Sequence, residues 1–209
     1  MAQTAIPVWP VWAITGRSQL QMISEGAESS LGLSAYQDVL KKEKISRDPK
    51  LNALVTRVGS RIAAATGRTD YKWEFTVIDN DKLANAFCLP GGKVAVYTGI
   101  MPVAQDEAGL AAVIGHEVAH AIARHGGERM SQQLLLEGVA LAAAVSADDE
   151  RKRELYATLL GVGATFGILL PYSRLHESGA DRMGLVYMAK AGYDPRAARD
   201  FWARMATND

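Results

Sequence analysis

The sequence lacks the cysteines for an internal disulfide and has no excess of charge of either sign. It contains one cysteine, Cys88, among 209 residues, and a single cysteine excludes a disulfide within the chain. Its 23 basic residues balance 23 acidic ones, so there is no basic excess of the kind that favours nucleic acid as a partner. We expect Cys88 to pack as a small apolar residue, because no base partner for a nucleophilic thiol is apparent.

The sequence also lacks a long, strongly apolar run. The apolar stretch at residues 155–170 falls short of the roughly 20 residues that a membrane-spanning helix needs, and three glycines weaken it as a helix. With the apolar stretch at residues 134–145, it predicts a helical insertion at residues 128–170 that forms a buried or dimerising hairpin. Membrane insertion is the alternative, and a role as a lid or as a substrate-binding surface is also open. The same region could form a homo-oligomer or associate peripherally with a membrane.

The N-terminal residues do not read as a targeting signal. Residues 1–16 have neither a basic start nor a continuous apolar core, so they are not a signal peptide. We expect residues 1–30 to form an extended arm that packs on the body of the protein or on a partner. Residues 31–209, with 48% hydrophobic content in the whole chain, suffice for one globular domain.

Hydrophobic periodicity predicts an α+β domain that is predominantly helical, with a small β-sheet beside its central helix. Gly67 is expected to end one helix, and Asp48 followed by Pro49 is expected to begin it. The expected helices cover residues 34–44, 49–66, 106–124, 171–191 and 195–205, and the expected strands cover residues 73–78 and 93–97.

The segment HEVAH, from His116 to His120, lies inside the expected helix at residues 106–124. Residues four apart on a helix lie one above the other, so both imidazoles can bind one metal ion. Glu117 lies about 100° further round and can reach a water on that metal. Zinc peptidases use this arrangement, with the glutamate as general base. Two surface histidines on an ordinary helix are the alternative.

A third metal ligand is expected, because catalytic zinc usually has three protein ligands. His125 lies about 180° round the helix from His116 and reads as a residue of the C-terminal turn. Glu177 and Asp181 share a face of a later helix, from which His176 points away. The economical assignment makes Glu177 the third ligand and lets Asp181 orient an imidazole. An ordinary exposed acidic helix face is the alternative.

Three blocks of sequence together resemble the bacterial envelope zinc metallopeptidases of the BepA, LoiP and HtpX type, relatives of the CAAX prenyl endopeptidases. The first block is NAFCLPGGKVAVYTG at residues 85–99, the second surrounds HEVAH at residues 109–125, and the third is YSRLHESGAD at residues 172–181. Their order and spacing agree with the family, and the similarity runs from about residue 32 to the end.

The resemblance implies a zincin-like gluzincin domain that holds one zinc ion per chain. It implies His116, His120 and Glu177 as ligands, Glu117 as general base and a role near the metal for Asp181. The partners it implies are protein or peptide substrates. They are unfolded, misassembled or membrane-associated proteins that are cleaved in envelope quality control.

The sequence departs from the family pattern at several positions. Cys88 stands where the family has a small residue such as alanine, and Gly179 stands where many members have an acidic residue. Many members carry a His-Pro motif after the segment matching residues 192–195, and this sequence does not. The resemblance implies the bacterial periplasm or cell envelope, although no leader is recognised in this chain.

Two roles stay with several candidates. Arg174 and Tyr172 are candidates for steadying the oxyanion, and Arg174 is equally suited to pair with Asp181. An edge strand can hold a substrate by backbone pairing, and either Asn85, Ala86 and Phe87 or residues 93–97 could supply it, with ordinary sheet packing as the alternative. A zinc-binding scaffold with little cleavage and an auto-inhibited peptidase are the rival functions.

Overall fold

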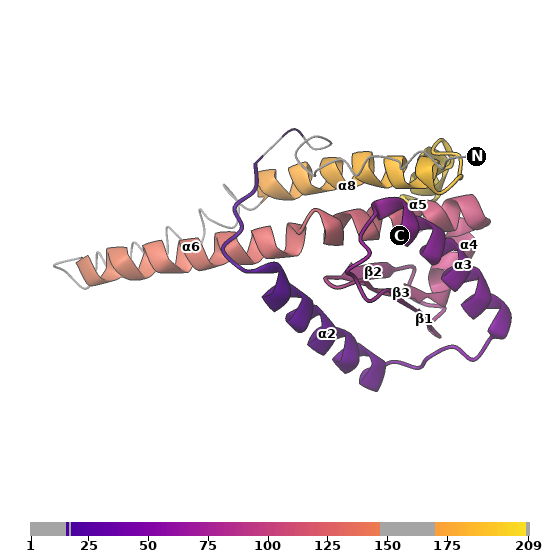
Figure 1. The fold of residues 1–209 in the computed structure, drawn as a ribbon, viewed down its shortest axis with the longest axis horizontal. Coiled ribbons are helices and arrows are strands. Elements are labelled where there is room, and N and C mark those ends of the chain that lie inside the picture. The colour runs from indigo at the N-terminus through magenta and orange to yellow at the C-terminus, as the bar shows by residue number, and fades with distance from the viewer. Residues whose placement is uncertain (1–15, 17, 147–169, 208–209) are drawn as a thin grey trace.

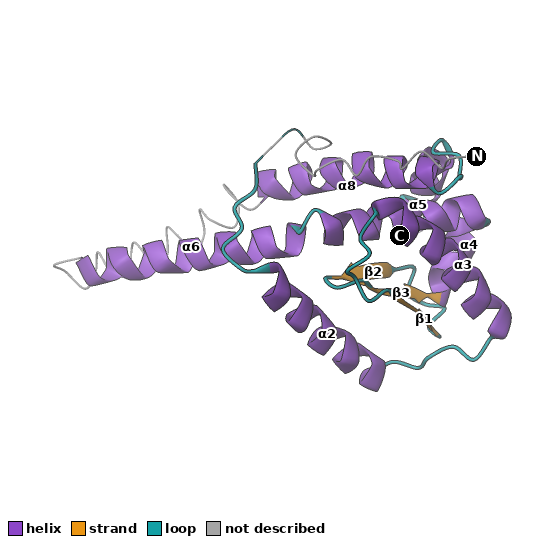
Figure 2. Ribbon diagram, viewed as in Figure 1, coloured by secondary structure: helices purple, strands orange, loops and turns teal. Residues whose placement is uncertain are grey.

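The computed structural model describes residues 16, 18–146 and 170–207, and its helices surround a small sheet (Figures 1 and 2). The helices are α2 (Glu25–Lys42), α3 (Pro49–Thr66), α4 (Met101–Ala104), α5 (Glu107–Ile122), α6 (His125–Ser146), α8 (Leu170–Lys190) and α9 (Ala197–Met205). The strands are β1 (Glu74–Ile78), β2 (Ala86–Leu89) and β3 (Lys93–Tyr97), followed by a 3-10 turn at Thr98–Ile100. The predicted α+β, mainly helical class is confirmed.

Capping residues set the start of the two helices that matter most for the core. Asp48 accepts hydrogen bonds from the backbone N–H groups of Lys50 and Leu51, and α3 ends at Gly67 with φ 73°. Asp106 accepts from the backbone N–H of Gly109 and so begins α5. Side-chain caps of this kind satisfy backbone donors that have no partner within the helix. Both helix starts agree with the sequence prediction.

Helix α2 begins earlier than the expected start at residue 34. Ser24 caps it, and the helix continues through Gly32. A Cβ at Gly32 would lie 2.5 Å from the carbonyl oxygen of Pro90, so glycine is needed there for close packing against the loop between β2 and β3. Glycine disfavours a helix interior, and the contact that requires it here is not visible in the sequence.

The sheet has the order β1-β3-β2, with β1 parallel and β2 antiparallel to β3. Strand β3 therefore pairs on both sides, and the suggestion that residues 93–97 hold substrate as an edge strand is wrong. Strand β2 is an edge strand of this sheet. The segment with Asn85, Ala86 and Phe87 thus stays a prediction for the substrate strand.

Side chains alternate across the sheet and join it to two helical layers. Ala86 and Cys88 of β2 point into the main core, which contains α3, α5 and α8. Phe87 and Leu89 pack on the other face, against the smaller cluster around Tyr36 of α2. Cys88 is a buried free cysteine, and burial raises the pKa of its thiol, in agreement with its predicted packing role. Helix α5 is consequently central, between the sheet and α8.

Helix α6 projects away from this body in Figure 1. It covers the first part of the insertion expected at residues 128–170, whereas the apolar stretch at residues 155–170 falls almost wholly outside the described residues. None of the helices in the described ranges has the length and apolar character that crossing a membrane requires.

Candidate metal centre

Close contact between two helices brings the candidate ligands together. A Cβ at Gly184 of α8 would lie 3.1 Å from the backbone nitrogen of His116, and one at Gly115 would lie 3.3 Å from the carbonyl oxygen of Gly184. With only hydrogen at both positions, α5 and α8 meet almost backbone to backbone. Glu177, two turns earlier on α8, then lies directly over the HEVAH face of α5.

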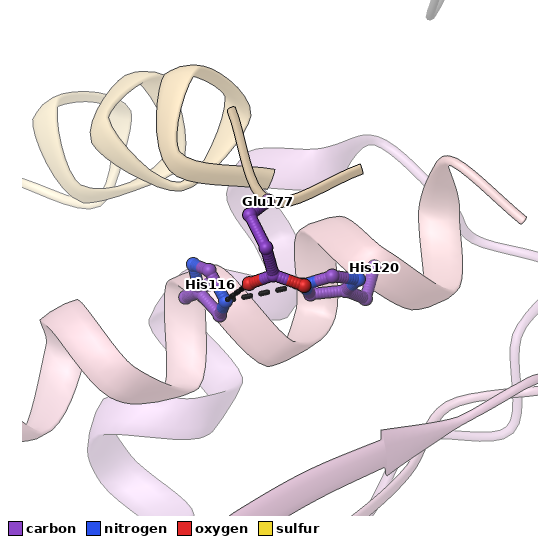
Figure 3. Close-up of side chains that lie close together, drawn as sticks. All are labelled: His116, His120 and Glu177. Atoms are coloured by element: carbon purple, nitrogen blue, oxygen red, sulfur yellow. Dashed lines mark hydrogen bonds and ion pairs between the residues drawn. The ribbon is translucent and has the colours of Figure 1, made fainter. Parts of the chain in front are cut away.

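Figure 3 shows the Glu177 carboxylate reaching from α8 to a point between the two imidazoles. His116 Nε2 lies 3.3 Å from Glu177 Oε2, and His120 Nε2 lies 3.5 Å from Glu177 Oε1. The two Nε2 atoms are 3.1 Å apart. One potential ligand atom from each of the three residues lies within 4.8 Å of those of the other two.

These spacings suit a tetrahedral metal ion. Zinc binds histidine nitrogen and carboxylate oxygen at about 2.0–2.2 Å, which at tetrahedral angles separates neighbouring ligand atoms by about 3.3–3.6 Å. The separations of His116, His120 and Glu177 are close to that range. Burial lowers the pKa of His120 to about 4, with a further contribution from His116, so its imidazole is neutral at pH 7 and can bind a cation. The residues present fit a divalent metal with one open position.

The other ring nitrogen of His116 is held by Asp181. His116 Nδ1 lies 3.0 Å from Asp181 Oδ1, and because Nε2 faces the metal site, Nδ1 carries the proton and donates. Trp202 of α9 meets the same imidazole edge-on, at 4.9 Å between ring centres. Asp181 and Trp202 together fix the plane of the His116 ring.

The other ring nitrogen of His120 meets a buried cluster, formed by His125, His176 and Glu128. His120 Nδ1 lies 3.0 Å from His125 Nδ1, and the His125 ring stacks on His176 with ring centres 4.4 Å apart. His176 Nε2 lies 3.0 Å from Glu128 Oε2. All members of the cluster are at most 2% exposed. The expectation that His125 is a simple turn residue at a helix end is wrong.

A break in the helix explains how His125 returns to the site. Arg124 has φ 55°, which ends α5 and starts α6 in a new direction. Arg124 donates hydrogen bonds to Glu28, which is 1% exposed, and to the carbonyl oxygen of Ile23. Gln19 and Gln21 donate to the carbonyl oxygens of Ala123 and Arg124. The N-terminal segment thus satisfies backbone groups that the break leaves open.

Glu117 lies beside the three candidate ligands but is not one of them. It is partly buried, and burial, with the nearby charge of Glu177, raises the pKa of its carboxyl to about 8. A bound cation would lower that pKa again, because an opposite charge favours the carboxylate. A carboxyl group in this setting can accept and return a proton near neutral pH.

The structure places the remaining predicted site residues as follows. Arg174 is exposed near the start of α8, and Asp181 pairs with His116 instead. Tyr172 lies in the first turn of α8, where side chains are outside the described part of the chain. Asn85 is exposed beside β2, whereas Ala86 and Phe87 belong to β2 itself. The sequence reasoning missed Trp202 and the roles of His125, His176 and Glu128. The only signal for the two histidines was their closeness to the ligands, since His125 lies five residues after His120 and His176 directly precedes Glu177.

Comparison with known proteins agrees with this geometry. A family model described as Peptidase family M48 matches residues 49–208. The mitochondrial metalloendopeptidase OMA1 of Schizosaccharomyces pombe is 39% identical over 195 residues, covering 92% of this chain and 56% of that protein. A putative beta-barrel assembly-enhancing protease of Vibrio cholerae is 31% identical over 217 residues, covering 97% of this chain and 44% of that protein.

The corresponding beta-barrel assembly-enhancing protease of Escherichia coli is 25% identical over 197 residues, covering 91% of this chain and 40% of that protein. The chain thus spans about half the length of the curated relatives it matches.

Proposed function

The chain belongs to peptidase family M48, and from that membership we propose that it is a zinc-dependent endopeptidase. The single observation that carries the proposal is the convergence of His116, His120 and Glu177, with Glu117 beside them. In this proposal, His116, His120 and Glu177 hold the metal ion. When bound, zinc would supply Lewis acidity that makes a water more acidic and a carbonyl carbon more electrophilic.

The side chains then have separate roles in the reaction. Glu117 accepts a proton from the attacking water and returns it to the amine that leaves, so that the peptide bond is hydrolysed with no net change in the enzyme. Asp181 holds the His116 ring through its Nδ1–H, and His125 holds the His120 ring in the same way. Strand β2, with Asn85, Ala86 and Phe87, is proposed to hold the substrate backbone at its free edge.

We propose unfolded or misassembled proteins as substrates, in protein quality control. Two groups of relatives support this role, the mitochondrial metalloendopeptidases and the bacterial proteases named for enhancing beta-barrel assembly. The bacterial envelope is the proposed compartment, and a mitochondrial compartment is the alternative that the first group supports. Fractionation of source cells with an antibody against this chain distinguishes the two.

The proposed activity is tested by cleavage of a chemically unfolded protein, with and without a metal chelator. We expect the wild-type chain to cleave, a chelator to abolish cleavage and added zinc to restore it. Glu117→Gln is expected to lower the rate by about 100-fold or more, the scale of a lost general base. Glu107→Gln is the matched control on α5, because Glu107 forms a partly exposed ion pair with Arg57 at the far end of the helix.

Two outcomes would contradict the proposal. Cleavage by Glu117→Gln at the wild-type rate would remove Glu117 from the mechanism. Zinc bound at one ion per chain without any cleavage would instead favour a zinc-binding scaffold that holds client proteins.

A further inference from the structure

Glu128 is a buried carboxylate to which the proposed reaction gives no role. It is 1% exposed, and each of its carboxylate oxygens has a donor. His176 Nε2 lies 3.0 Å from Oε2, and Gln132 Nε2 lies 3.4 Å from Oε1. Since a carboxylate only accepts, His176 Nε2 carries the proton in this contact. A buried pair of this kind often stabilises a fold no more than two apolar side chains of similar size would, so stability alone does not explain it.

The contact of Glu128 with His176 joins the start of α6 to α8, one residue before the third candidate ligand. Helix α8 also meets α5 closely at Gly184, two turns after Glu177. Glu177 therefore lies between two contacts that fix its helix. Its own side chain is 55% exposed. The position of the carboxylate thus depends on the backbone that these contacts hold, more than on packing around the carboxylate itself.

The same contact reaches His120 by a second route. His125 and Glu128 are three residues apart and share a face of α6, and both meet His176 there. The rings of His125 and His176 stack with an angle of 19° between their planes. Because His120 Nε2 faces the metal site, His120 Nδ1 carries the proton and donates to His125 Nδ1. A rotation of the His125 ring out of its stack would remove this acceptor, and a fixed His176 ring opposes that rotation.

We propose that Glu128 is a positioning residue for two of the three metal ligands. Through its hydrogen bond to His176 it fixes the segment of α8 that carries Glu177. The same bond holds the His176 ring against His125, which orients the ring of His120. The inference rests on the proposed zinc centre and deepens it, because it names a remote side chain on which ligands from two helices depend.

A double substitution tests the role without leaving the His176 N–H unpaired. Glu128→Leu combined with His176→Leu replaces the pair by two apolar side chains. We expect zinc affinity, measured by competition with a chromophoric chelator, to fall by about 10-fold, as for other partners outside the ligand set. The unfolding midpoint of the metal-free protein should stay unchanged or rise. Equal zinc affinity in wild type and the double variant overturns the positioning role and leaves the zinc centre intact.

Single substitutions supply a conservative variant and a control. Glu128→Gln keeps an oxygen that can accept from His176 Nε2, so we expect it to retain most of the zinc affinity that Glu128→Leu loses. Equal losses in these two variants would overturn the role of the hydrogen bond. Ser131→Ala is the control, because Ser131 is buried on α6 but bonds to Met22 and Gly127 instead of the histidines. We expect it to change stability without changing zinc affinity.

Cobalt(II) bound in place of zinc reports the arrangement of the ligands. Its visible absorption depends on the geometry of the donor atoms, which a purely structural role of Glu128 would leave unchanged. The metal-free full chain is titrated with cobalt(II), and we expect wild type, Ser131→Ala and Glu128→Gln to give one spectrum and the double variant another. Identical spectra in wild type and the double variant overturn the positioning role. Zinc affinity that is unchanged in Glu177→Ala would instead contradict the zinc centre itself.

Discussion

His116 and His120 lie one turn apart on α5, yet the outer nitrogens of their rings meet different surroundings. His116 donates to Asp181, whose side chain is 53% exposed beside an open cavity. His120 meets the fully buried His125, which stacks on His176. A partner on an exposed helix face can be replaced by water, whereas a buried partner cannot. The two ligands of one motif therefore depend on the rest of the protein to different degrees.

The largest expected effect comes from removing the Glu177 carboxylate, which lies near both His116 and His120. Glu177→Ala takes away the carboxylate that lies between the two imidazoles, so we expect zinc affinity to fall by more than about 100-fold, beyond the usual effect of an outer partner. Competition with a chromophoric chelator measures the affinity. Ser178→Ala, at the exposed neighbouring position, is the control. Unchanged affinity in Glu177→Ala would show that the third ligand lies elsewhere.

The position of His125 beside His120 depends on the break between α5 and α6, which can be weakened by a substitution away from the metal centre. Glu28→Gln removes the buried charge that pairs with Arg124 at the break between α5 and α6. We expect the free energy of unfolding to fall by about 3 kcal/mol, as for a buried ion pair that loses one partner. Urea denaturation of the metal-free protein measures it.

Glu25→Gln is the control for that variant. Glu25 lies on α2, as Glu28 does, but its ion pair with Arg68 is more exposed. We expect a loss below about 1 kcal/mol there. Equal losses of unfolding free energy in the two variants would show that the buried pair of Glu28 and Arg124 stabilises the protein no more than an exposed pair does.

The two outer partners can be compared directly. We expect His125→Leu to lower zinc affinity by about 100-fold and Asp181→Asn by about 10-fold, since effects of such partners span that range and only the exposed one can be replaced by water. His125→Asn, which keeps a polar acceptor, should recover part of the affinity. The unfolding midpoint of each metal-free variant separates a loss of metal binding from a loss of folding. A larger effect of Asp181→Asn would reverse the comparison.

The smallest expected effect concerns the glycines that begin α6. A Cβ at Gly127 would lie 1.5 Å from Glu28 Oε1, so we expect Gly127→Ala to destabilise the protein by about 1–2 kcal/mol. A Cβ at Gly126 would have no neighbouring atom within 4 Å among the described residues. Gly126→Ala should therefore be neutral or slightly stabilising, since alanine favours a helix. Thermal unfolding of the pair measures the difference. Similar unfolding midpoints would mean that the Glu28 side chain can move aside for a methyl group at position 127, against the close packing of Glu28 on α6.

The sequence predicted the His116 side better than the His120 side for a physical reason. Helical spacing alone places His116, His120 and Glu117 on α5 and puts Glu177 and Asp181 on one face of α8, so local geometry leads to most of the centre. The position of His125 depends on the positive φ at Arg124, a residue type that rarely adopts it.

That backbone conformation is stabilised by Glu28 and Ile23, far away in sequence, and no local pattern reveals such contacts. The sequence also predicted α3 and β3 correctly but missed the start of α2, because Gly32 is explained only by its contact with Pro90. Local signals thus predict elements and facing residues, whereas long-range contacts decide where helices break.

The most direct test of the metal centre is anomalous X-ray scattering from crystals of the zinc-loaded chain, recorded on both sides of the zinc absorption edge. The account predicts one zinc peak at about 2.0–2.2 Å from His116 Nε2, His120 Nε2 and a carboxylate oxygen of Glu177. A zinc ion bound away from these residues, or one held without Glu177, would contradict it.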